Sequence, residues 1–243
     1  MPIVRIGEKT PAIVVLAAML VSACGGGGVG HPSPSPQSNF DLQTAVAALV
    51  KSGLTASVSL SGTVIVNGTS NPVTGTGTLT LSPGTSGLFN NVAAQLQTQS
   101  LSGTITVAGQ NAPYSSSVVN AYEPATAAIL GESQHSEFDV AQAPIAIPTA
   151  VGTAVTILGT MSRYSDNTLS VALGTVQVSV AVTEIPVDPG SPEIVQFTYK
   201  VFDTNQVLVE TDTFSYTLNP DNLLTFSSAA TQNASGSLTA TPQ

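Results

Sequence analysis

From residue 54 onward, apolar and polar residues alternate over long runs, and this pattern constrains the fold more than any other feature of the chain. In the first run, Val58 and Leu60 alternate with Ser57, Ser59 and Ser61. Successive side chains of a β-strand point to opposite faces, so the alternation predicts strands with one dry and one wet face. Similar runs follow at 73–81, 102–107, 153–164, 168–185, 193–203, 206–218 and 223–228.

Short segments rich in Asp, Asn, Pro and Ser separate most of these runs, for example 165–167 and 219–222. Such segments favour tight reversals. The predicted fold class is therefore mainly all-β, with roughly ten antiparallel strands in a meander that forms a curved sheet or half-open barrel. A closed barrel is the other alternative, because closure pairs the edge strands with each other. Between 123 and 150 the pattern indicates short strands and a long connection, and the polar segment 231–243 is expected to fray.

Two hairpins resemble each other. Residues 61–68 and 102–109 share a Ser-Gly-Thr start, alternating β-branched residues and a glycine end. The pattern indicates one hairpin used twice, although chance similarity between Thr- and Gly-rich strands stays open. We expect a long first turn over 67–72. Gly75 and Gly77 fall on the dry face, where they indicate strong curvature or a close approach by a helix.

One helix is predicted at 40–53, where apolar residues recur at helical spacing. Asn39 or Asp41 can cap its beginning, and Gly53 ends it. Lys51 is its only cation, which is too few for a helix that lies on an anionic membrane surface, so we expect the helix to pack on the sheet. Residues 39–243 then form a single β-rich domain.

The beginning of the chain resembles the signal sequence of a bacterial lipoprotein. Arg5 and Lys9 precede an apolar run at 13–21, and Leu20-Val21-Ser22-Ala23-Cys24 resembles a lipobox. The run is too short to span a bilayer. The resemblance implies cleavage after residue 23, acylation of Cys24 and a Gly- and Pro-rich tether at 24–38. The alternative is an ordinary cleaved signal peptide in which the cysteine is coincidental.

In such lipoproteins an Asp after the acylated cysteine commonly retains the protein in the inner membrane, and here Gly25 stands in that place. The resemblance therefore implies an anchor in the outer membrane of the cell envelope, with the domain facing either the periplasm or the outside. The layout of anchor, tether, helix and meander is also loosely similar to that of bacterial lipoprotein-localisation carriers and related lipid-binding lipoproteins.

The charge balance excludes several kinds of partner. Removal of the leader takes away two of five cations and one of fourteen acids, which leaves three cations (Lys51, Arg163, Lys200) and a net charge of −10. Three cations cannot form a basic patch, so we expect no nucleic-acid partner. The chain has no Trp and few aromatic residues, which disfavours carbohydrate sites and stacking platforms. Phosphate loops, dinucleotide fingerprints and cysteine clusters are absent from the sequence, so no cofactor is expected.

A metal site is the sharpest chemical hypothesis. His135, Glu137 and Asp139 alternate and would share one face of a strand, but neighbours on that face lie ~7 Å apart, too far to hold one zinc without help from other strands. The competing interpretation is a polar surface loop. Ser133 after Gly131 resembles part of a nucleophile elbow, but His135 stands where the elbow needs glycine.

Two carboxylates, Glu210 and Asp212, are in register with apolar Phe214 and Tyr216. They could point into a cavity as an acid–base pair, or the strand could switch faces at a bulge and leave them in solvent. Arg163 and Lys200 could pair with acids across strands. The Asp-containing turns at 166–167 and 203–205 could offer oxygens to calcium but lack EF-hand spacing.

These observations predict a lipid-anchored envelope protein without catalytic activity. We expect no catalytic residues, metal or cofactor, with Cys24 as the functional residue. Its domain would be a structural or protein-interaction module. The alternative is a carrier or binder of an apolar, lipid-like ligand on the dry face of the curved sheet.

Overall fold

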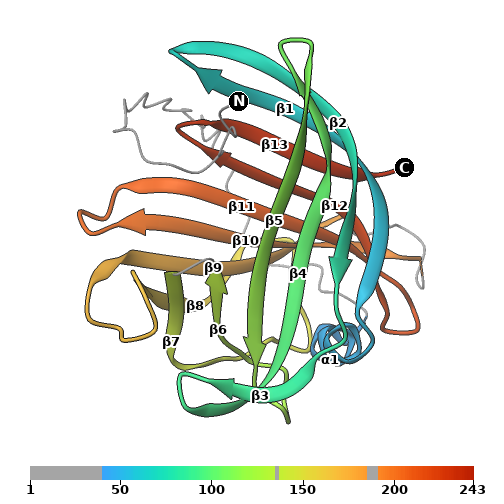
Figure 1. The fold of residues 1–243 in the computed structure, drawn as a ribbon. Helices are drawn as coiled ribbons and strands as arrows, with labels where there is room; N and C mark the ends of the chain where they lie inside the picture. Colours follow the sequence, from blue (N-terminus) through green and yellow to red (C-terminus); the bar gives the residue numbers. More distant parts are fainter. Residues whose placement is uncertain (1–39, 135–136, 185–190) are drawn as a thin grey trace, which may run out of the picture.

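The structure is a computed structural model that describes residues 40–134, 137–184 and 191–243 (Figure 1). Cys24, Asn39 and His135 lie outside these residues. The described part contains one helix, α1 (Leu42–Ser52), and thirteen antiparallel strands. The strands are β1 (Leu54–Val66), β2 (Thr69–Leu81), β3 (Thr85–Phe89), β4 (Val92–Val107), β5 (Gln110–Tyr122), β6 (Ile129–Gln134), β7 (Glu137–Ile145), β8 (Thr156–Tyr164), β9 (Ala172–Glu184), β10 (Glu193–Asp203), β11 (Leu208–Leu218), β12 (Leu224–Asn233) and β13 (Gly236–Pro242).

The prediction of an all-β fold with one helix near the start of the domain is confirmed, but the sheet is more closed than a curved sheet or half-open barrel. Strands pair in the order β2-β1-β13-β12-β11-β10-β9-β8-β7-β6-β5-β4, and β2 pairs in turn with β4. The result is a closed antiparallel barrel of twelve strands, with β3 attached beside β2 on the same edge of β4. Closure gives every barrel strand two neighbours and removes the exposed edges.

The end of the chain takes part in this closure, so the prediction that it frays was wrong. Strand β13 pairs with β1 at Leu60↔Ala240 and with β12 at Thr231↔Leu238. Leu238 and Ala240 face the interior and are buried. Two apolar residues among polar ones are a weak sequence signal, but they are enough to bury one face of a short strand between two long ones.

Glycines line the seam where β2 meets β4. A Cβ atom on Gly75 would lie 2.2 Å from the carbonyl oxygen of Thr104, and one on Gly103 would lie 2.6 Å from the Cα of Gly77. The close approach that these glycines indicated is therefore made by the backbone of β4, and not by the helix. The seam requires small residues because the two backbones approach each other closely there.

Gly103→Ala is expected to destabilise the fold by about 1–2 kcal/mol, because the new methyl group must displace backbone at the seam. The matched control is Gly109→Asn, at an exposed turn where nothing lies within 4 Å of the added Cβ and Asn tolerates the positive φ. Urea unfolding of both variants measures the difference. A Gly103→Ala protein as stable as the control would contradict the interpretation of the seam.

The two similar hairpins use the same turn. Asn67-Gly68 joins β1 to β2, and Ala108-Gly109 joins β4 to β5, with positive φ at all four residues. Two successive left-handed residues match the twist of the flanking strands. The first turn is thus shorter than predicted, and β2 already begins at Thr69.

Helix α1 closes one end of the barrel, at the bottom of Figure 1. Its N-cap is Asp41, whose carboxylate accepts a hydrogen bond from Thr44 N at 3.0 Å and whose own N–H donates to Asn222 Oδ1 at 2.9 Å. The helix therefore begins at the later of the two predicted capping residues. No described helix has the length and apolarity needed to cross a membrane.

The other end of α1 is fastened as well. Gly84 N donates to the carbonyl oxygen of Val50 at 2.7 Å, and the buried Gln97 Nε2 donates to that of Leu49 at 3.1 Å. Gly84 thus satisfies a carbonyl group that the helix end leaves open, and Gln97 adds a second donor to the carbonyl of Leu49, which also accepts from Gly53 N at 2.9 Å. Both ends of α1 are thus hydrogen-bonded to the barrel wall, and the helix forms a fixed floor.

Candidate functional site

The barrel encloses a cavity with a volume of about 100 Å³. Eight strands already make a barrel that side chains just fill, so twelve leave more room than the wall residues can occupy. Val46 and Leu49 of α1 fill one end and line the cavity from below. The space that remains lies between this apolar floor and the polar side chains on the inner faces of β6 and β11, Glu132 and Asp212.

Aromatic rings form one wall of the cavity. Tyr199 of β10 packs edge-to-face on Phe214 of β11, with ring centroids 6.0 Å apart. One layer closer to the floor, Phe197 and Tyr216 make the same kind of contact at 6.5 Å. Edge-to-face pairs hold rings in fixed orientations and contribute about 0.5–1.5 kcal/mol beyond burial. All four rings line the cavity.

Acidic side chains gather on the inner faces of three strands, β6, β7 and β11, above the aromatic wall. Cross-strand pairing places Glu132 opposite Asp139 and Asp139 opposite Arg163. On the facing side, β11 carries Glu210 and Asp212. The lumenal acids are Glu132, Glu137, Asp139, Glu210 and Asp212, and Arg163 is the one cation that we find among them in the described residues.

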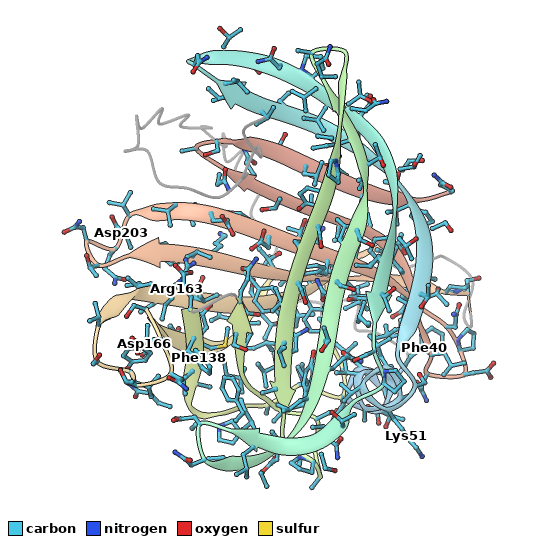
Figure 2. The ribbon with its side chains drawn as sticks, viewed as in Figure 1. Phe40, Lys51, Phe138, Arg163, Asp166 and Asp203 are labelled. Atoms are coloured by element: carbon cyan, nitrogen blue, oxygen red, sulfur yellow. The ribbon has the colours of Figure 1, made fainter. Side chains whose placement is uncertain are left out.

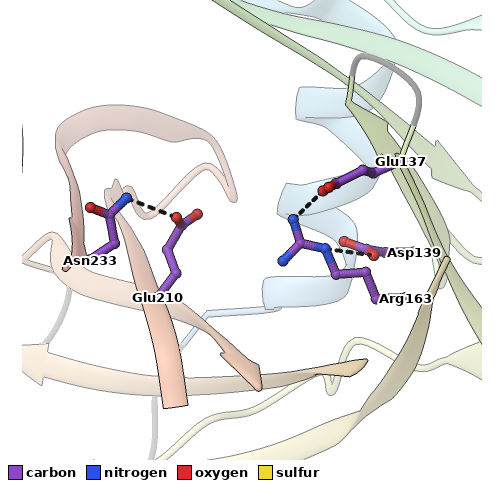
Figure 3. A network of polar contacts seen from close by, with 5 residues as sticks. All are labelled: Glu137, Asp139, Arg163, Glu210 and Asn233. Atoms are coloured by element: carbon purple, nitrogen blue, oxygen red, sulfur yellow. Dashed lines mark hydrogen bonds and ion pairs between the residues drawn. The ribbon is translucent and has the colours of Figure 1, made fainter. Parts of the chain in front are cut away.

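Figure 3 shows the two sides of this cluster facing each other, with α1 behind them. Arg163 Nη2 donates to Glu137 Oε2, and its Nε lies 3.8 Å from Asp139 Oδ1. Opposite, Asn233 Nδ2 donates to Glu210 Oε2 at 3.0 Å. The side chains of Arg163 and Glu137 keep 23% and 34% of their surface exposed, so this end of the lumen is open to water.

The pKa of Glu132 is raised to about 8. The larger cause is burial, which disfavours the charged form, and the second is repulsion between a Glu132 carboxylate and the negative charges of Asp139 and Asp212. At neutral pH Glu132 is therefore mostly protonated, and its carboxyl group donates to Asp139. Burial also raises the pKa of Asp139, to about 6, against the opposing effect of Arg163. The pair holds one proton between two carboxyl groups.

A second pair lies across the lumen. The pKa of Asp212 is raised to about 7, chiefly by burial and then by the charge of Glu210, while a hydrogen bond with Thr231 lowers it. Glu132 and Asp212 both line the cavity. Two carboxyl groups that hold protons near neutrality therefore border a single apolar space.

The structure resolves the predicted alternatives for several residues. Glu210 and Asp212 point inward, so the expectation of a solvated face was wrong. The predicted bulge does exist, next to Val209, where the pairing of β10 and β11 shifts. Glu137 and Asp139 share the inner face of β7, as alternation predicted. Among the described residues, no three His, Cys, Asp or Glu side chains are placed to hold a metal ion.

The remaining candidates are part of the scaffold. Ser133 lies within strand β6, so the strand-to-helix turn of a nucleophile elbow is not formed there. Asp166 and Asp203 lie in the β8–β9 and β10–β11 loops, on the same side of the molecule (Figure 2). Asp203 Oδ1 accepts from the N–H groups of Asn205 and Val207, and these bonds lower its pKa. Lys200 is exposed on the outer face.

Comparisons with known proteins give no relatives: no family model matches the chain, and neither a curated protein nor a solved structure matches it.

Proposed function

We propose that the barrel is a binding protein for a small, largely apolar ligand that occupies the lumen between α1 and the carboxyl cluster. The observation that supports this proposal is the cavity, which is lined by Val46 and Leu49 on one side and by aromatic rings on the other. An apolar cavity with a few convergent polar groups is the usual form of a small-molecule site. The alternative prediction of a carrier thus becomes the leading proposal, with the ligand inside the barrel.

The geometry limits the size of the ligand and its route. A dry cavity of ~150 Å³ accepts benzene, so about 100 Å³ suits a single ring or a short alkyl chain with its polar end outside the cavity. Both ends of α1 are hydrogen-bonded to the barrel wall, so the helix blocks its end of the barrel. The ligand therefore enters through the opposite end of the barrel, beside Arg163. A larger lipid would have to displace the helix.

Binding of benzyl alcohol to the purified protein tests this proposal. We expect saturable shifts of amide resonances around the cavity in two-dimensional NMR spectra, and a rise in melting temperature. Val46→Phe should fill the space and abolish the shifts, whereas Ala47→Phe, on the exposed side of the same helix, should retain them. Equal binding by both variants, or no binding by the parent protein, would refute a lumenal site.

We further propose that Cys24 anchors the protein to the outer membrane through acyl chains. The lipobox resemblance supports this, and two or more chains make anchoring stable where one is marginal. Cys24→Ala is expected to move the folded domain from the membrane to the soluble fraction. Gly25→Asp should retain the anchor but shift the protein to the inner membrane. Fractionation of cells and palmitate labelling give the readout, and a membrane-bound Cys24→Ala protein would contradict the anchor.

The competing function is a structural or protein-interaction module on the outer face of the barrel. Leu88, Val155 and Ile157 favour it, because each is a large apolar residue more than 60% exposed. Crosslinking in intact cells would detect such a partner, and Leu88→Ser with Ile157→Ser should abolish its capture without changing ligand binding.

A further inference from the structure

We propose that the lumen selects an organic cation: a ligand with a protonated amine attached to an apolar body about the size of one ring. This inference rests on the proposed function, and it adds the chemical class of the ligand. The argument starts from the charge balance of the cluster. Five carboxyl groups face the lumen, and among the described residues we find one cation beside them, Arg163. The empty site therefore has more potential negative charges than positive ones.

A second observation shows that a hydrogen-bond donor is missing as well. Asp139 is only 9% exposed, and its Oδ1 has no hydrogen-bond partner. Arg163 Nε forms an ion pair with this oxygen at 3.8 Å but is too distant for a hydrogen bond, because the guanidinium group is directed to Glu137. Figure 3 shows this carboxylate beside the guanidinium group of Arg163. A buried acceptor without a donor costs free energy that a ligand can recover.

The arrangement of the carboxyl groups suits an ammonium group better than a neutral or an anionic one. Glu132 and Asp212 border the cavity from opposite sides of the barrel, so a cation between them meets acceptors in two directions. An ammonium group has three donors and no acceptor, which matches a site built from carboxyl oxygens. The rings of Tyr199 and Phe214 add cation–π attraction. A carboxylate ligand would be repelled.

Binding should be linked to proton release. The groups that face the site are Glu132 on β6, Glu137 and Asp139 on β7, Arg163 on β8, Glu210 and Asp212 on β11, and the phenols Tyr122, Tyr199 and Tyr216. In the empty lumen Glu132 and Asp212 hold protons near neutrality. A ligand cation favours their ionised forms and expels those protons. Affinity should therefore rise between pH 6 and pH 8.

Three ligands of similar shape test the selection: benzylammonium, benzyl alcohol and benzoate. Calorimetry with the full-length protein is expected to show that benzylammonium binds at least tenfold more tightly than benzyl alcohol, and that benzoate does not bind. Titrations in two buffers of different ionisation enthalpy should reveal proton release at pH 7. Equal affinity for the amine and the alcohol would overturn this inference and leave the proposed function intact. Failure of all three ligands would overturn both.

Substitutions of the lumenal carboxyl groups test whether the preference for the amine arises in the lumen. Glu132→Gln and Asp212→Asn should each reduce the advantage of benzylammonium over benzyl alcohol at least fivefold. Asp221→Asn, in an exposed turn, is the matched control and should leave both affinities unchanged. If the amine keeps its full advantage in both lumenal variants, the selection does not arise in this cluster and the inference fails.

Discussion

Glu132→Gln is expected to make the protein more stable than the parent at alkaline pH, by about 3 kcal/mol at pH 9. The pKa of Glu132 is about 8 in the folded state, against an ordinary value of 4.5. Each unit of difference corresponds to ~1.4 kcal/mol, and we discount the total because the side chain borders a cavity open to water. Glutamine cannot ionise, yet its amide can donate to Asp139 as the protonated acid does.

The sign of the pH dependence follows from the direction of the shift. A carboxyl group with a raised pKa binds its proton more tightly in the folded than in the unfolded protein. Its contribution to stability is full below about pH 4.5 and is lost as the pH rises towards 8. Asp139 and Asp212, with pKa values of about 6 and 7, act in the same direction. The parent protein should therefore be more stable at pH 5 than at pH 8.

Urea unfolding between pH 5 and pH 9 measures this effect. The parent and Glu132→Gln should be nearly equal at pH 5 and diverge above pH 7, and Asp221→Asn should follow the parent throughout. Parallel curves for the parent and Glu132→Gln would show that Glu132 is not buried as a neutral acid. A site residue that lowers stability at working pH is common where a protein keeps unpaired groups for binding.

The alternation of residues predicted the strands and their inner faces well because each strand has one apolar face. Strand β10 has the predicted bounds, and strand β9 lies within the predicted run 168–185. Closure was harder to predict because it depends on pairs distant in sequence. The β2–β4 seam and the β1–β13 pair join strands that no local pattern connects.

The candidate site was predicted only in part, and a bulge explains the main omission. Ile129 and Gly131 both pair with β5, and Leu130 is the extra residue between them. The bulge turns Glu132 inward, whereas simple alternation from Ile129 would place it outside. Glu210 and Asp212 were recognised as possible inward carboxylates, since no bulge separates them from Phe214. The convergence of acids from three strands follows from closure of the barrel, which the alternation pattern did not decide.

Arg163→Met is expected to destabilise the protein by about 1–2 kcal/mol at pH 8, between the cost of breaking an exposed and a buried ion pair. Methionine keeps much of the length of the side chain but removes the cation that we find in the lumen among the described residues. Glu137 and Asp139 then lose their partly buried ion pairs, and their charges are left uncompensated. Arg163 also opposes the upward shift in the pKa of Asp139, so its loss should drive that pKa higher.

The pH dependence separates this electrostatic effect from a loss of packing. Asp139, with its pKa raised to about 6, is largely protonated at pH 4.5, so Arg163→Met should cost less there than at pH 8, whereas a packing defect would cost the same at both. Arg163→Lys retains the charge and should lose only a fraction of the stability. Benzylammonium should stabilise Arg163→Met more than the parent, because the ligand supplies the cation that the variant lacks. A pH-independent loss that the amine does not reverse would show that Arg163 acts through packing and that the cluster does not recognise cations.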